Sequence, residues 1–107
     1  MVAASDRRAA IRFPANLDGS CECIPGPRGE SWLATVQDVS ATGMCLAVER
    51  RFEPNTLVLV DLPTTSQCVV GSLLARVKRV RRADDGSWIL GCEFAQPLSS
   101  AEVQDIL

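Results

Sequence analysis

The chain has no histidine, and only 5% of its 107 residues are aromatic. Without histidine, Ser–His and Cys–His catalytic pairs and histidine-ligated metal sites are excluded. No apolar stretch reaches the roughly 18 residues of a membrane-spanning helix. Residues 1–10 lack the apolar run of a secretory signal. Length and composition therefore predict one cytoplasmic globular domain with no membrane span.

The cysteines show neither the spacing of a disulfide framework nor that of a zinc site. They are Cys21, Cys23, Cys45, Cys68 and Cys92. An odd number without an export signal argues against disulfides, and no pair has the C-x2-C spacing of a zinc knuckle. We expect most of them to be small apolar core residues. Cys21 and Cys23 fall on one face of a strand, and the spacing leaves open which way that face points.

The formal net charge is -2 and the isoelectric point is near 5.0, so the bulk charge gives no general affinity for nucleic acids or anionic membranes. An anion would have to bind at a local cluster of basic residues. The most basic segment holds Arg76, Lys78, Arg79, Arg81 and Arg82. Its simplest interpretation is the solvated outer face of a strand. The alternatives are a surface for a partner or a nucleic-acid surface on a small OB-like fold. The scarcity of aromatic residues disfavours the nucleic-acid surface.

Alternating apolar and polar residues predict short strands separated by turn signals. A change of inward parity predicts a bulge near Lys78-Arg79, and Asp85-Gly86 predicts a two-residue hairpin turn. The expected strands cover 15–24, 31–37, 44–48, 56–62, 68–82 and 88–94.

The C-terminal residues predict a helix, because Ser99 and Glu102 form a capping box. Closing an antiparallel sheet removes its exposed edges. We therefore expect an all-β fold, a small six-stranded antiparallel barrel with one C-terminal helix. The chain is expected to divide into an arm (1–14), the barrel (15–97) and the helix (98–107).

The first motif with potential chemistry is R-R-A-A-I-R in the N-terminal arm, which supplies Arg7, Arg8 and Arg12. A guanidinium group is a planar fork that pairs with phosphate or stacks on a nucleobase. Arginines on an arm can fold over a ligand held by the barrel. A solvated, charged tail is the alternative.

The second motif is D-V-S-A-T-G, from Asp38 to Gly43. The Asp38 carboxylate is a suitable acceptor for the N1–H and the exocyclic amine of guanine, Ser40 offers a hydroxyl, and Gly43 permits a positive φ or a close approach. The alternative is an ordinary turn whose side chains bond to their own backbone. Together the two motifs indicate a ligand with both phosphates and guanines.

The pair R-x3-R (Arg8, Arg12) followed by D-x-S-x-x-G (Asp38, Ser40, Gly43) resembles the PilZ domain family, which binds the bacterial second messenger cyclic di-GMP. The resemblance extends to residues 43–46, to residues 90–94 and to the capped helix, and so covers nearly the whole chain. It implies that Arg8 and Arg12 bind phosphates and stack on guanine, and that Asp38 accepts hydrogen bonds from the Watson–Crick edge of guanine. It also implies that Ser40 hydrogen-bonds the ligand and that Gly43 lets the backbone approach the ligand closely.

The same resemblance implies how many ligands bind and what kind of protein this is. An arginine at the position of Arg7 accompanies an intercalated dimer of cyclic di-GMP in similar domains, so two ligands per domain are expected. The implied protein is a receptor and not an enzyme, with no cofactor, no metal and no DNA or RNA partner. Its arm orders over the ligand and signals to a downstream protein. The alternative is a barrel that docks to a partner without binding the nucleotide.

Overall fold

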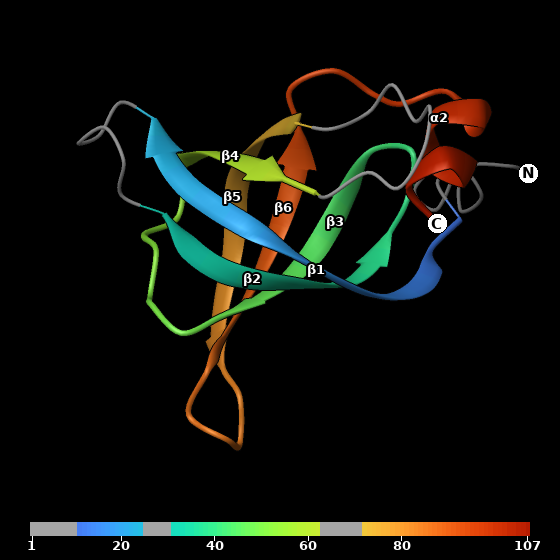
Figure 1. Cartoon of the computed structure of the whole chain (residues 1–107). Coiled ribbons are helices and arrows are strands. Elements are labelled where there is room, and N and C mark those ends of the chain that lie inside the picture. The colour runs from blue at the N-terminus through green and yellow to red at the C-terminus, as the bar shows by residue number, and fades with distance from the viewer. Residues whose placement is uncertain (1–10, 25–30, 63–71) are drawn as a thin grey trace, which may run out of the picture.

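A computed structural model describes residues 11–24, 31–62 and 72–107 (Figure 1). Six strands and a short helix make up this part of the chain. They are β1 (Phe13–Ile24), β2 (Trp32–Val39), β3 (Gly43–Val48), β4 (Leu57–Asp61), β5 (Ser72–Arg82), β6 (Trp88–Phe94) and α2 (Ser100–Ile106).

The strands form a closed antiparallel barrel in the order β1-β2-β3-β6-β5-β4 (Figure 1). β1 is the closing strand, because it pairs with β2 on one side and with β4 on the other. Closure removes the two edge strands that an open sheet of this size would expose. The expected fold class is confirmed.

The barrel interior is filled by the inward half of each alternating strand. Met44, Leu46 and Val48 of β3 and Leu90 of β6 are all at most 2% exposed. Burial of such apolar surface is the main term favouring the folded state. Phe52, in the connection from β3 to β4, is also 2% exposed.

Two of the four cysteines in the described ranges are core residues, fewer than the expected majority. Cys21 and Cys92 are buried, whereas Cys23 and Cys45 are half-buried. Cys68 lies outside the described residues. The described ranges contain no group of Cys, Asp and Glu placed to hold a metal ion.

Local signals in the sequence place most elements to within two residues. The predicted bulge is confirmed, since the register of β5 against β6 shifts between Val77 and Arg79. β1 begins at Phe13, within the expected arm, because Phe13 pairs with Val39. Residues 1–10 of the expected arm and residues 68–71 of the expected fifth strand lie outside the described ranges.

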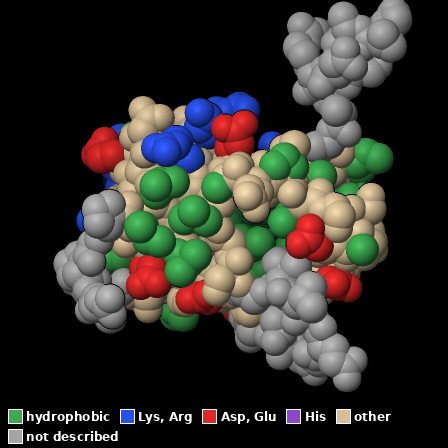
Figure 2. All heavy atoms as spheres, turned by 90° about the horizontal axis from the view of Figure 1, so that it is seen from above, with side chains coloured by type: hydrophobic (Ala, Val, Ile, Leu, Met, Phe, Trp, Pro, Cys, Tyr) green, Lys and Arg blue, Asp and Glu red, His purple; other side chains and the backbone are tan. Residues whose placement is uncertain are grey.

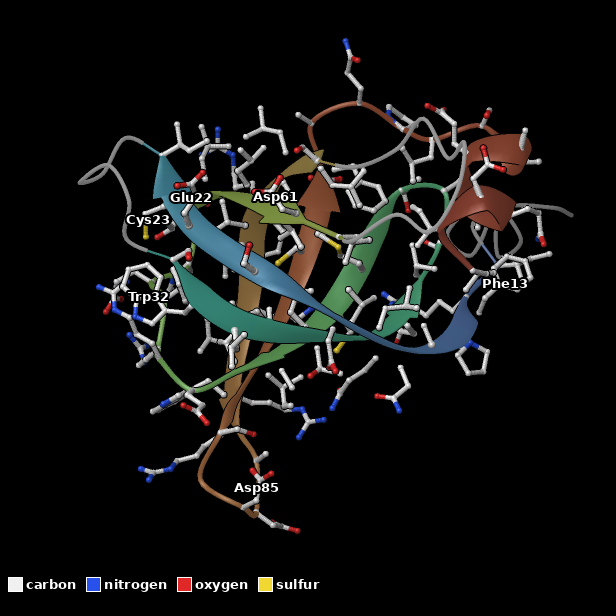
Figure 3. All side chains as sticks on the ribbon, in the orientation of Figure 1. Phe13, Glu22, Cys23, Trp32, Asp61 and Asp85 are labelled. Carbon is white, nitrogen blue, oxygen red and sulfur yellow. The ribbon has the colours of Figure 1, made fainter. Side chains whose placement is uncertain are left out.

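The predicted two-residue turn at Asp85-Gly86 is wrong in length. The Ala83 amide donates to the Ser87 carbonyl at 2.8 Å, which leaves three residues at the tip. Asp85 accepts from both the amide and the hydroxyl of Ser87, at 2.9 and 2.6 Å, and Gly86 takes a φ of 91°. Asp85 therefore lies at the end of a hairpin that projects away from the barrel (Figure 3).

The capping box that predicts the helix is present. The Ser99 hydroxyl accepts from the Glu102 amide at 3.1 Å, and the Glu102 carboxylate accepts from the Ser99 amide at 2.8 Å. The buried residues of α2, Val103 and Ile106, join the core. In the described ranges, no helix has the length and apolar character needed to cross a bilayer.

The two ends of the barrel differ. Phe13 and α2 lie at one end, and Trp32 lies at the other (Figure 3). The guanidinium group of Arg50 covers the Trp32 ring at 4.5 Å and the Phe52 ring at 4.9 Å. Arg50 therefore makes a favourable cation–π arrangement with two aromatic rings at the Trp32 end.

We predict that Cys21 and Cys92 resist alkylation in the folded protein at mildly alkaline pH. Burial is the main reason that the pKa of each thiol rises to about 12, so almost no reactive thiolate forms. Both should react once the protein is unfolded in denaturant. Peptide mass spectrometry after iodoacetamide treatment measures this, and equal labelling of Cys92 in the two states would contradict the burial.

Candidate functional site

The two motifs meet at the end of the barrel where β1 begins. A guanidinium nitrogen of Arg12 lies 2.5 Å from a carboxylate oxygen of Asp38. The strand register explains the contact, because Pro14, close after Arg12, is the pairing partner of Asp38. The Arg12 side chain is 60% exposed and that of Asp38 is 29% exposed, so both groups remain open to a ligand.

A register shift turns Asp38 toward the outside of the barrel. Val36 and Val39 both point inward and are at most 1% exposed. Since strict alternation cannot place both of them inside, the strand is irregular between Val36 and Asp38. Asp38 therefore stands on the outer face, opposite Cys45 of β3.

Ser40 is turned inward to organise the loop between β2 and β3. It is 2% exposed, and its hydroxyl accepts from the amides of Thr42 and Gly43, each at 3.2 Å. The Ser40 amide also donates to the Gly43 carbonyl at 2.8 Å. These are the self-contained bonds of a serine turn, and they fix the loop that follows Asp38.

Gly43 is required by the neighbouring strand. A Cβ atom at this position would lie 2.2 Å from the carbonyl oxygen of Cys92 on β6. Gly43 is not among the described residues with a positive φ, so close approach is the reason for glycine here. In this structure, the backbone that lies close to Gly43 is that of β6.

The segment before α2 is tied to the same loop. The Leu98 amide donates to the Ala41 carbonyl at 2.7 Å, and the Phe94 amide donates to the Thr42 carbonyl at 2.8 Å. The loop is therefore held from both sides, by its own serine and by the C-terminal segment.

A groove of about 860 Å³ crosses the outer face of β3, β6 and β5 next to this loop. Its volume falls in the usual range of small-molecule sites. Arg12 lies on one side, and basic residues of β5 lie on the other. The lining includes Arg12, Cys45, Lys78, Arg79, Arg81 and Gly91.

The Cys45 thiol feels charges from both sides of the groove. Partial burial raises its pKa most, the carboxylate of Asp38 raises it further, and the guanidinium groups of Arg12 and Arg81 oppose this by lowering it. Arg81 is on β5, two strands away from β3. Charged groups on both sides of the groove therefore influence the Cys45 thiol.

Taken together, these residues can hold an anionic ligand with a planar polar group. Arginines on both walls suit phosphate, and the Asp38 carboxylate suits a pair of N–H donors. Arg12, Asp38, Ser40 and Gly43 are brought into one region, whereas Arg7 and Arg8 lie outside the described residues. The basic residues of β5 that line the other side of the groove were not predicted as part of the site. Their position beside β3 and β6 depends on strand pairing between distant segments, which sequence patterns do not reveal.

The profile of the PilZ domain matches residues 6–107, so the chain belongs to the PilZ domain family. The PilZ domain of Escherichia coli YcgR, solved with cyclic di-GMP, has the same fold. Its TM-score is 0.64 at 17% identity, and the match covers 94% of this chain and 86% of that one.

The Bacillus subtilis inhibitor of motility (MotI/DgrA) is a second structural match, with a TM-score of 0.64 at 17% identity. The match covers 94% of this chain but only 47% of the Bacillus protein, so this chain spans about half of that length. No curated protein sequence matches the chain. At this identity the two structures establish the fold.

We predict that Gly43→Ala destabilises the protein, while Gly91→Ala on the adjacent strand does not. The first substitution forces a Cβ against backbone and should lower the free energy of unfolding by about 2 kcal/mol or more. In the second, the new Cβ meets only the Arg79 Cβ at 3.7 Å, an ordinary contact. Urea denaturation of the two variants measures the difference, and equal stabilities would refute the close approach of β3 and β6.

Proposed function

We propose that this domain is a cyclic di-GMP receptor that binds the messenger in the groove beside Arg12 and Asp38. One observation carries the proposal. Two motifs that lie 26 residues apart in the chain form a direct contact at the margin of a groove lined with cations. Membership of the PilZ family and the cyclic di-GMP on the YcgR domain support the same ligand.

Binding requires Arg12 and Asp38 to exchange partners. The Asp38 carboxylate accepts the N1–H and the exocyclic amine of a guanine, and Arg12 turns to a phosphate or to the face of the base. The ion pair that is lost is solvent-exposed. Exposed ion pairs contribute little to stability, so the exchange costs little.

Ser40 and Gly43 act on the ligand through the backbone. Ser40 holds the loop after Asp38, and its buried hydroxyl is already engaged by two amides. Gly43 keeps β3 close to β6, which brings the groove floor next to Asp38. These two residues position the carboxylate that reads the base.

Arg7 and Arg8 complete the site from the arm. Arg8 adds a second guanidinium group to that of Arg12, and Arg7 supports an intercalated pair of ligands per domain. The ordered arm changes the surface that a downstream protein meets, and an order–disorder change of this kind is a common signalling device. The proposed protein is a cytoplasmic receptor without catalytic activity.

We predict that Arg12→Ala and Asp38→Asn each weaken the binding of cyclic di-GMP by about 2 kcal/mol, roughly thirtyfold. Each removes a charge-assisted hydrogen bond to the ligand. Titration calorimetry on folded variants measures the affinity, with GTP and cyclic di-AMP as controls on the wild type. Arg8→Ala should behave in the same way, and unchanged affinities in all three variants would remove the assigned site.

Removing residues 1–12 should abolish binding of the messenger and leave the barrel folded, because β1 begins at Phe13. Thermal unfolding reports the fold, and calorimetry reports the ligand. Full binding by the truncated chain would show that the arm has no role. A wild-type domain that gives neither heat nor thermal shift with cyclic di-GMP would favour a barrel that docks to a protein partner.

A further inference from the structure

One row of residues runs across the outer face of the barrel, from Asp38 on β2 to Arg79 on β5. Strand register pairs Asp38 with Cys45, Cys45 with Gly91, and Gly91 with Arg79. The row crosses three strand spacings, which is about 14 Å. That span suits one nucleotide, with its base edge at Asp38 and its phosphate near β5.

The middle of this row carries no large side chain. Gly91 has no side chain, and a Cβ added there would meet nothing closer than 3.7 Å, so packing does not require glycine at this position. Cys45 beside it carries a small side chain. A planar base therefore has a flat floor between Asp38 and the basic strand.

The cations of β5 differ in whether they have partners. Arg76 donates to the Asn55 carbonyl at 2.9 Å, Lys78 lies 3.6 Å from the Glu93 carboxylate, and Arg82 covers the Trp88 ring at 5.4 Å. In contrast, Arg79 and Arg81 have no ion-pair or hydrogen-bond partner within the ranges that the structure describes. These two guanidinium groups also line the groove.

The surface view agrees with a concentration of positive charge on one side of the molecule. In Figure 2, Lys and Arg side chains gather at one margin, next to an apolar area. Two unpaired guanidinium groups on adjacent outward positions repel one another and attract an anion. A phosphate would give both of them the bidentate partner that they lack.

We infer that Arg79 and Arg81 form a second phosphate-binding wall of the groove, which receives the phosphate of a nucleotide whose guanine lies on Asp38. The inference rests on the proposed function and adds residues that neither motif contains. Arg12 contacts the ligand from one side of the groove, and Arg79 and Arg81 of β5 contact it from the other. The ligand class is a guanine dinucleotide with at least one phosphate facing β5.

The test compares two double variants that remove the same charge from the same strand. Arg79→Ala/Arg81→Ala removes the wall, and Arg76→Ala/Arg82→Ala leaves the groove lining intact. Calorimetry with cyclic di-GMP should show affinity at least tenfold weaker for the first and within threefold of the wild type for the second. Thermal unfolding checks that both are folded, and Arg79→Gln/Arg81→Gln replaces the first if it is not.

Salt dependence gives a second readout. Affinity for the wild type and for the control should fall as salt rises, and the wall variant should respond less, because fewer cations meet the ligand. Equal loss in both double variants would assign the effect to general charge and overturn the inference. No loss in either would also overturn it.

The result that would refute the cyclic di-GMP receptor function differs from the result that would refute only the role of Arg79 and Arg81. If the wild type does not bind cyclic di-GMP, both the function and the wall are refuted together. If the wild type binds, Arg12→Ala loses binding and the wall variant does not, the function stands and the wall alone is refuted.

Discussion

The close pairing of β3 with β6 is the constraint on which the rest of the structure depends. It closes the first three strands onto the last three, and it does so through a contact that only glycine permits, with the Cys92 carbonyl in the space of a Gly43 Cβ. The same pairing sets Cys45 beside Gly91 and so creates the floor of the groove. The stability of the barrel and the shape of the groove thus depend on one register.

The second half of the site follows from irregularities in otherwise regular strands. A shift in β2 turns Asp38 outward, and a shift in β5 leaves Lys78 and Arg79 on the outer face next to each other. Each irregularity is tolerated because the inward residues on either side, such as Val36 and Val39, stay buried. The core therefore stays packed, while Asp38, Lys78 and Arg79 lie on the outer face of the barrel.

Much of the fold could be predicted from sequence because its signals are local. Alternation of apolar and polar residues predicts the strands, and the Ser99–Glu102 capping box predicts where the helix begins. The change after Val77 in which residues point inward predicts the bulge. The turn length was wrong because Asp85 bonds to Ser87 and widens the tip. The part of the groove formed by β5 was not predicted. The order of strands around the barrel depends on pairing between distant segments, and the periodicity of a single sequence does not contain that order.

Binding of cyclic di-GMP across β2, β3, β6 and β5 can be followed by an amide NMR titration of the labelled domain. We expect chemical-shift changes along the row of Asp38, Cys45, Gly91 and Arg79, and none on the outer face of β1 and β4 around Leu59. Shifts confined to that opposite face, or none at ligand concentrations well above micromolar, would contradict the proposed site.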